Sequence, residues 1–104
     1  FRSPPGPPVD LEIRFKYPEI DRRDKQIMTV YVSRGNEAMS GVIIRFLVLD
    51  EDPLVEREAS PTNDSGRTSH EWAVRKFRGT TTVKVMAEAP DGGTGMATRT
   101  FFVR

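Results

Sequence analysis

The sequence predicts an all-β fold, an antiparallel β-sandwich of about seven strands. Short runs of alternating apolar and polar residues recur roughly every ten residues along the chain. Clusters of Pro, Gly, Asn and Asp separate these runs, and no convincing amphipathic helical pattern is present. The length of 104 residues suits one domain. Seven short strands at this spacing are typical of a sandwich of the immunoglobulin type.

The first expected strand, residues 10–17, alternates apolar with charged side chains until Pro18 ends it. The charged segment 19–26 predicts a solvated loop, with at most one helical turn. The run at 42–50 is apolar on both faces except at Arg45, which is typical of a strand inside a sheet or against a neighbouring domain. The later strands are expected at residues 27–33, 42–50, 55–59, 67–76, 80–89 and 96–103, of which 55–59 is a short edge strand.

The strongest turn signal is residues 61–66, which bring Pro, Asn, Asp and Gly together. Asp64 is expected to accept backbone hydrogen bonds in this turn, and Gly66 is expected to permit a positive φ. In the strand that follows, alternation places Trp72 on the same face as Val74. Trp72 is large enough there to bridge two sheets.

Residues 1–9 predict a proline-rich linker, followed by one immunoglobulin-like domain over residues 10–104. The linker contains four prolines and one glycine. Proline has no amide hydrogen to donate to a sheet, and proline-rich segments favour an extended helix of about 3 Å per residue. Such a segment is a semi-rigid spacer between domains. A frayed chain terminus is the alternative.

Several motifs occur in a characteristic order. Residues 41–46 have the form Gly-Val-x-Ile-x-Phe, and an Asn-Asp-Ser-Gly-Arg-Thr turn follows at 63–68. Thr-Val-Lys-Val-Met-Ala then stands at 82–87, and Thr-Phe-Phe-Val at 100–103. In this order, over about residues 27–103, the chain resembles the bacterial immunoglobulin-like domains found as tandem modules in invasin- and intimin-type adhesins. The resemblance implies an extracellular or cell-surface location in bacteria, with neighbouring domains of the same chain as partners.

Composition excludes several classes of function. The 16 basic and 15 acidic side chains leave a net charge of +1, which argues against a general nucleic-acid or anionic-membrane binder. No apolar run approaches the roughly 20 residues of a membrane-spanning helix, so no membrane insertion is expected. With no cysteine and one histidine, the chain has no thiol nucleophile and no multi-histidine metal site. We therefore expect no enzyme activity and no cofactor.

Two local features of the sequence are candidates for metal binding or catalysis. Asp50, Glu51 and Asp52 leave calcium binding open, but their spacing matches no calcium-loop template, and a solvated turn is the simpler interpretation. No metal ligand is assigned. His70 lies on the same strand face as Trp72 and Val74, so it is expected to be partly buried with a backbone partner. Ser69, its neighbour in the strand, faces the opposite side and therefore makes no nucleophile–base pair with it.

The aromatic residues define the candidate ligand contacts. Trp72, Tyr31 and Tyr17 combine a flat ring with a polar group, and on the surface they would form a platform for carbohydrate. Phe101 and Phe102 are adjacent and face opposite sides, so one of them is expected at the surface or at a domain contact.

Three functions follow from these observations. The leading hypothesis is a non-catalytic immunoglobulin-like module of a larger bacterial surface or exported protein, which acts as a spacer, a presentation module or a protein-interaction domain. The alternatives are a carbohydrate-binding module and an accessory domain of an extracellular enzyme. The corresponding partners are neighbouring domains, another protein, or a polysaccharide.

Overall fold

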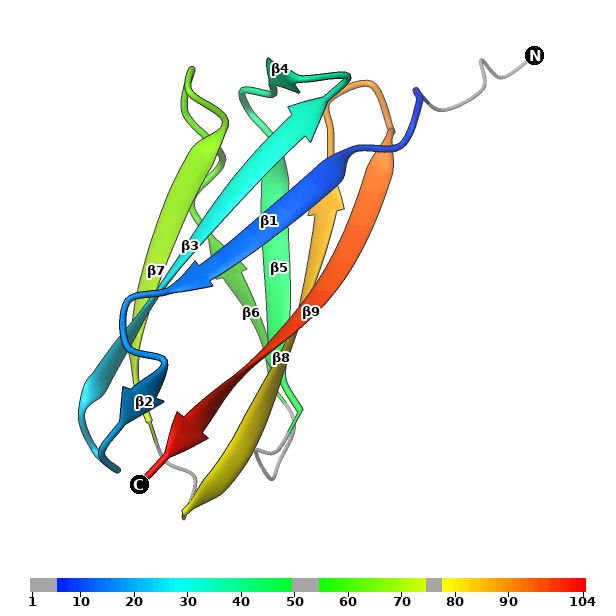
Figure 1. Cartoon of the computed structure of the whole chain (residues 1–104). Coiled ribbons are helices and arrows are strands. Elements are labelled where there is room, and N and C mark those ends of the chain that lie inside the picture. The colour runs from blue at the N-terminus through cyan, green and yellow to red at the C-terminus, as the bar shows by residue number, and fades with distance from the viewer. Residues whose placement is uncertain (1–5, 50–54, 75–77) are drawn as a thin grey trace.

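The computed structural model describes residues 6–49, 55–74 and 78–104. Within these ranges the chain forms nine β-strands and no helix. The strands make two sheets that pack face to face, so the predicted all-β sandwich is confirmed (Figure 1). Seven of the nine strands have four or more residues, and the other two, β2 and β4, have two residues each.

The first sheet is built around β3 (Lys25–Arg34). It pairs antiparallel with β1 (Asp10–Phe15), with β7 (Arg67–Ala73) and, beyond its end, with β4 (Glu37–Ala38). Every second residue of β3 is buried, in the alternation expected of a sheet with one face on the core.

The second sheet has the order β2-β9-β8-β5-β6. Its pairs are antiparallel except the short parallel contact between β2 and β9. The five strands are β2 (Glu19–Ile20), β5 (Ile43–Val48), β6 (Glu56–Ala59), β8 (Gly79–Glu88) and β9 (Thr94–Val103). The predicted edge position of residues 55–59 is borne out by β6, which ends this sheet.

The prediction of a solvated loop at 19–26 is confirmed for residues 21–24, which are exposed and belong to no strand, but it is wrong at both ends. Ile20 is buried, 3% exposed, and β2 pairs with the end of β9. Gln26 is fully buried at the start of β3. A two-residue strand shows no periodicity in the sequence, and the charged neighbours of Ile20 conceal the one side chain that enters the core.

The turn at residues 61–66 is formed as expected, but with a different acceptor. Gly66 has φ +72°. The side-chain oxygen of Asn63 accepts from the amides of Ser65 and Arg67, at 2.9 and 3.1 Å, in the position predicted for Asp64. The Asp64 carboxylate instead accepts from a serine hydroxyl, that of Ser40, at 3.4 Å.

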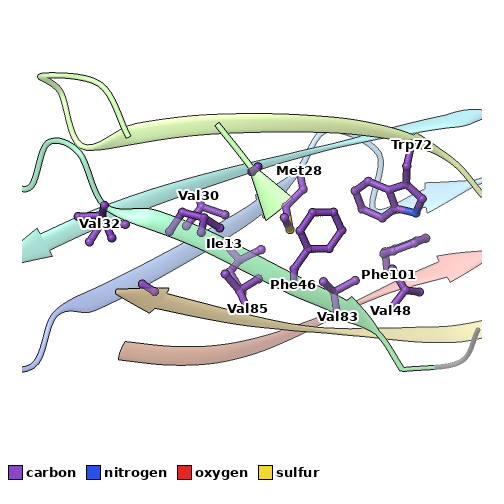
Figure 2. Packing of buried hydrophobic residues seen from close by; sticks show 14 of the residues in the cluster. Ile13, Met28, Val30, Val32, Phe46, Val48, Trp72, Val83, Val85 and Phe101 are labelled. Atoms are coloured by element: carbon purple, nitrogen blue, oxygen red, sulfur yellow. The ribbon is translucent and has the colours of Figure 1, made fainter. Parts of the chain in front are cut away.

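The core lies between the sheets, and Phe46 of β5 occupies its middle with no exposed surface (Figure 2). Phe101 is buried, whereas Phe102 is 37% exposed, as the alternation of β9 requires. The buried apolar residues are Val9, Ile13, Ile20, Met28, Val30, Val32, Val42, Ile44, Phe46, Val48, Ala59, Trp72, Val74, Val83, Val85, Ala87, Ala89, Phe101 and Val103.

The domain is elongated, with extents of 49 × 27 × 18 Å. Its radius of gyration, 14.5 Å, exceeds the roughly 13 Å expected of a compact domain of this length. The amide of Gly6 donates to the carbonyl of Asp91, in the turn that follows β8. The amide of Arg104 donates to the carbonyl of Ile20, which lies near the start of β8. The entering and leaving segments therefore lie at opposite ends of the long axis (Figure 1).

Candidate functional site

Trp72 lies inside the sandwich and presents no platform to solvent. It is 8% exposed and is enclosed by the rings of Phe15, Phe46 and Phe101, with ring centroids 6.5, 5.6 and 6.1 Å away. Figure 2 shows Trp72 beside Phe46 and Phe101. The tilted and edge-to-face arrangement is the geometry that aromatic side chains prefer in cores. Trp72 thus bridges the two sheets, and the prediction that it contacts a ligand is wrong.

His70 is partly buried next to the same aromatic cluster, with its ring 5.0 Å from that of Phe46. Among the described residues its contacts are with rings, and the expected hydrogen bond to a backbone group is not found. Burial is the main cause that lowers the pKa of His70, and the positive charge of Arg57 lowers it further. The imidazole is therefore held neutral as part of the core.

We expect the domain to lose stability as the pH falls through the range near 6.5 in which an unfolded histidine takes up its proton. Because the pKa of His70 is lowered by folding, the unfolded chain binds that proton first, and the equilibrium moves toward unfolding. The loss is complete below the folded-state pKa. Urea midpoints measured at about pH 7.5 and 5.5 give the difference in stability between the two pH values. This difference should be smaller in the His70→Gln variant. An equal difference in the variant would contradict this assignment.

Tyr31 lies on the outer face of the first sheet, between Glu12 of β1 and Arg67 of β7. It is partly exposed, and the guanidinium of Arg14 stands 5.2 Å from the centre of its ring. The backbone of Tyr17 is hydrogen-bonded to the side chain of Gln26. Gln26 lies five residues before Tyr31 on β3, which is about 16 Å along the strand. The two tyrosines therefore do not form one platform.

Tyr17 is exposed at the bend where the chain leaves the first sheet for the second. The fully buried Gln26 amide fixes its backbone: the Tyr17 amide donates to Oε1 at 3.2 Å, and Nε2 donates to the Tyr17 carbonyl at 2.7 Å. The neighbouring Pro18 carbonyl accepts from the amide of Phe102 at 2.9 Å. These bonds replace the strand ladder that ends with β1 and hold the bend in one position.

A hollow of about 520 Å³ lies beside Tyr17. The tyrosine side chain is 39% exposed, and the Lys16 ammonium stands 5.4 Å from the centre of its ring. The lining residues are Lys16, Tyr17, Glu19, Ile20, Asp24, Lys25, Ile27, Glu71 and Arg104. We call this region the Tyr17 hollow. Of the three predicted ligand contacts, Tyr17 is the one that lines it.

At the opposite end, Arg34 ties the N-terminal segment to the β8–β9 turn. Its guanidinium donates to both carboxylate oxygens of Asp91, at 2.6 and 3.1 Å, and to the carbonyl of Pro7 at 2.7 Å. The amides of Gly6 and Val9 donate to the carbonyls of Asp91 and Thr94 at 3.0 and 3.1 Å. We call this arrangement the N-terminal clamp.

Three glycines are required by the close approach of these segments, and one of them is Gly95, where a Cβ would collide with the Val9 carbonyl. A Cβ on Gly6 would collide with the Asp91 carboxylate, and one on Gly93 would collide with the Pro7 carbonyl and Arg34. Val9 places its side chain in the core, 5% exposed. The described part of the predicted linker, residues 6–9, is thus fastened to the domain, while residues 1–5 lie outside the described ranges.

The charges of the clamp stabilise each other. The hydrogen bond from Arg34 and the amide of Gly93 lower the pKa of Asp91 to about 2, and the same pair raises the pKa of Arg34. Asp91 is therefore ionised throughout the neutral and mildly acidic range. Arg34 lies 57 positions from Asp91, and no local pattern relates them. The sequence alone therefore does not predict the clamp.

The outer face of the second sheet is a third exposed region. Met96 is 63% exposed beside Met86 and Ile43, around a hollow of about 400 Å³. Arg45 crosses this face between Glu56 and Glu88, at 3.7 and 3.6 Å. The predicted interior position of strand 42–50 is confirmed, since β5 lies between β8 and β6, but its outer face is only partly covered.

The described residues hold no group of three or more His, Asp or Glu side chains placed to bind a metal. Asp50, Glu51 and Asp52, considered for calcium, lie outside the described ranges. No helix among the described residues is long and apolar enough to cross a membrane.

The fold defines a two-sheet β-sandwich domain, and comparison with solved structures agrees. The chain is similar to the PmoD soluble domain from Methylocystis sp. ATCC 49242 (Rockwell), with a TM-score of 0.52 and 15% identity over 92% of this chain and 90% of that one. At this identity the likeness shows the fold alone. No protein-family model matches the chain, and no curated protein matches it.

Proposed function

We propose that this chain is a non-catalytic, immunoglobulin-like module of a larger bacterial surface or exported protein. In this role it spaces and orients neighbouring domains, which are its partners, and it needs no cofactor and no nucleic acid. The observation that carries the proposal is the N-terminal clamp, because a segment that only joined domains would not need three hydrogen bonds to the domain surface. The surface or exported location follows from the resemblance to bacterial adhesin modules.

Strand order supports the immunoglobulin-like assignment. In an immunoglobulin constant domain the first, second and fifth strands share one sheet, and the third, sixth and seventh share the other. The seven longer strands follow the same division, with β1, β3 and β7 in one sheet and β5, β8 and β9 in the other. The fourth, β6, differs, since it pairs with β5 at the edge of the second sheet.

The shape of the domain supports a spacing role. Its entering and leaving segments lie at opposite ends of a body 49 Å long. Modules joined at such ends extend a chain rather than fold it back. The clamp then fixes the direction in which the preceding segment leaves the sandwich, through Arg34, Asp91 and the amides of Gly6 and Val9.

Arg34→Ala is expected to release this segment while the sandwich stays folded. Because Arg34 holds both Asp91 and the Pro7 carbonyl, the amides of Gly6 and Val9 should exchange with solvent about tenfold faster or more. To test orientation, a small folded reporter protein is joined at Gly6 in place of residues 1–5. NMR relaxation should show reporter and sandwich tumbling as one body, and Arg34→Ala should separate their rotational correlation times.

Arg14→Ala is the matched control, because it removes another arginine–carboxylate pair, that with Glu12 at 3.0 Å, without touching residues 6–9. This variant should leave exchange and tumbling unchanged. Independent tumbling of the reporter in the unsubstituted protein would overturn the orienting role. Equal effects of the two substitutions would show that the clamp is not its cause.

A further inference from the structure

We propose that the Tyr17 hollow binds a neutral saccharide. The inference goes beyond the spacing role and does not rest on it, because the hollow lies at the end of the domain opposite the N-terminal clamp. Its volume of about 520 Å³ is in the range of roughly 300–1,000 Å³ that small-molecule sites occupy. That volume is enough for a short stretch of sugar units.

The charges that line the hollow favour a neutral ligand with many hydroxyl groups. Three of its side chains are acidic and three are basic, so neither an anion nor a cation gains from a net field. The same groups supply both acceptors and donors of hydrogen bonds, and a hydroxyl group uses both, since it donates one hydrogen bond and accepts up to two. The acidic members are Glu19, Asp24 and Glu71, and the basic members are Lys16, Lys25 and Arg104.

Two of the acceptors have no partner among the described residues. In the part of the chain that the structure describes, the carboxylates of Glu19 and Asp24 accept no hydrogen bond and form no salt bridge. The other charges have partners: Lys25 pairs with Glu71 at 3.6 Å, and Arg104 pairs with Asp21 outside the hollow at 3.1 Å. Carboxylates that have no partner among the described residues, and that lie beside an exposed ring, are suited to accept hydrogen bonds from sugar hydroxyls.

Tyr17 supplies the apolar face that a sugar ring needs. Its side chain is 39% exposed, and an aromatic ring of this kind offers a flat apolar body with a hydroxyl at its tip. The Lys16 ammonium now lies over that ring, at 5.4 Å from its centre. Lysine carries this charge on a flexible four-carbon stem, so it is able to swing toward ligand hydroxyls when a sugar stacks on the ring.

The position of Tyr17 is fixed before any ligand arrives. The buried Gln26 amide bonds both backbone groups of Tyr17, and the Lys16 amide donates to the carbonyl of Ile27 at 2.9 Å. Binding therefore orders little backbone, which is the main cost that weakens contacts made by exposed loops. Gln26 is a positioning residue in this proposal, since it acts through Tyr17.

The hollow on the second sheet fits this ligand class less well. Met86, Met96 and Ile43 line it, and its Arg45 is engaged by two glutamates. It has no aromatic side chain. Nothing in the structure shows what covers that face.

The experiment is an amide NMR titration of the full chain with neutral gluco-, xylo-, manno- and N-acetylglucosamine hexasaccharides, each to about 10 mM, the range of weak binding. At least one should give saturable shifts at the amides of residues 16, 17, 19, 24, 25 and 71. Tyr17→Ala should weaken that binding tenfold or more. Tyr31→Ala, the matched control at the other tyrosine, should leave the affinity unchanged.

Several results would overturn the proposal. These are no saturable shift with any of the four probes, shifts that map to Tyr31 instead, or an unaltered affinity in the folded Tyr17→Ala variant. Tighter binding of an oligogalacturonate than of the neutral probes would also reject it, because it would show a preference for anions. None of these results changes the tumbling of the reporter fusion, so the two proposals fail separately.

Discussion

Phe46→Ala is expected to lower the free energy of unfolding by about 3–5 kcal/mol, measured by urea denaturation at 25 °C. Phe46 is fully buried on β5, an interior strand of the second sheet, and contacts the rings of His70 and Trp72 from the first. Phe46 lies among the buried side chains between the two sheets (Figure 2). The substitution removes its phenyl ring, and because many other side chains set the separation of the sheets, a cavity remains. Domains of this size are stable by about 5–15 kcal/mol in total.

Phe102→Ala is the matched control for this prediction. Phe102 is also a strand phenylalanine, but it is 37% exposed and its backbone bonds to Pro18 do not depend on its ring. We expect a loss of less than about 1 kcal/mol, as for most surface substitutions. Similar losses from the two substitutions would mean that the core is not organised around Phe46.

The aromatic core was predictable in part because alternation is a local property. The pattern in β7 places Trp72 and Val74 on one face, and the structure buries both. The pattern in β9 places Phe101 and Phe102 on opposite faces, and only Phe101 is buried. What alternation does not state is which face is the core. For this reason Trp72 was open to two interpretations, a sheet bridge or a sugar platform, until its neighbours from β1 and β5 were known.

Contacts between distant segments were not predictable. β2 exists because Ile20 and the end of β9 meet, and 83 positions separate Ile20 from Val103, its partner in the register. The N-terminal clamp likewise depends on three segments that come together only after folding, around Arg34, Asp91 and Pro7. Each of these residues has an ordinary local explanation as a strand, turn or linker residue. Their joint role arises from the sandwich topology.

The two ends of the domain are specialised by different physical means. At one end an arginine, a carboxylate and close glycines hold the incoming chain, and the guanidinium of Arg34 pairs with the Asp91 carboxylate through two of its three nitrogens, with Nε left buried and unbonded among the described residues. At the other end Tyr17 is equally fixed, through Gln26, but the nearby Glu19 and Asp24 are left available among the described residues. A fixed backbone with its opposite charges paired fits a joint, whereas a fixed backbone beside carboxylates that have no partner among the described residues fits a binding site.

Gly66→Ala is expected to destabilise the domain by about 3 kcal/mol or more. Gly66 has φ +72°, which costs a residue with a Cβ about 1–2 kcal/mol. A Cβ at this position would also lie 2.5 Å from the backbone carbonyl oxygen of Val32. That segment cannot easily move, because the amide of Val32 donates to the Gly66 carbonyl at 2.7 Å and holds the turn against β3. Strain and clash therefore add, and urea denaturation measures their sum.

Gly35→Ala separates the two causes. Gly35 also has a positive φ, +56°, but a Cβ there would meet no atom within 4 Å. This variant should lose only the conformational part, about 1–2 kcal/mol. The excess loss in Gly66→Ala then measures the contact with Val32. If the two variants lost equal stability, the turn would have room to shift, and the close packing of residues 63–66 on β3 would not be a constraint on the fold.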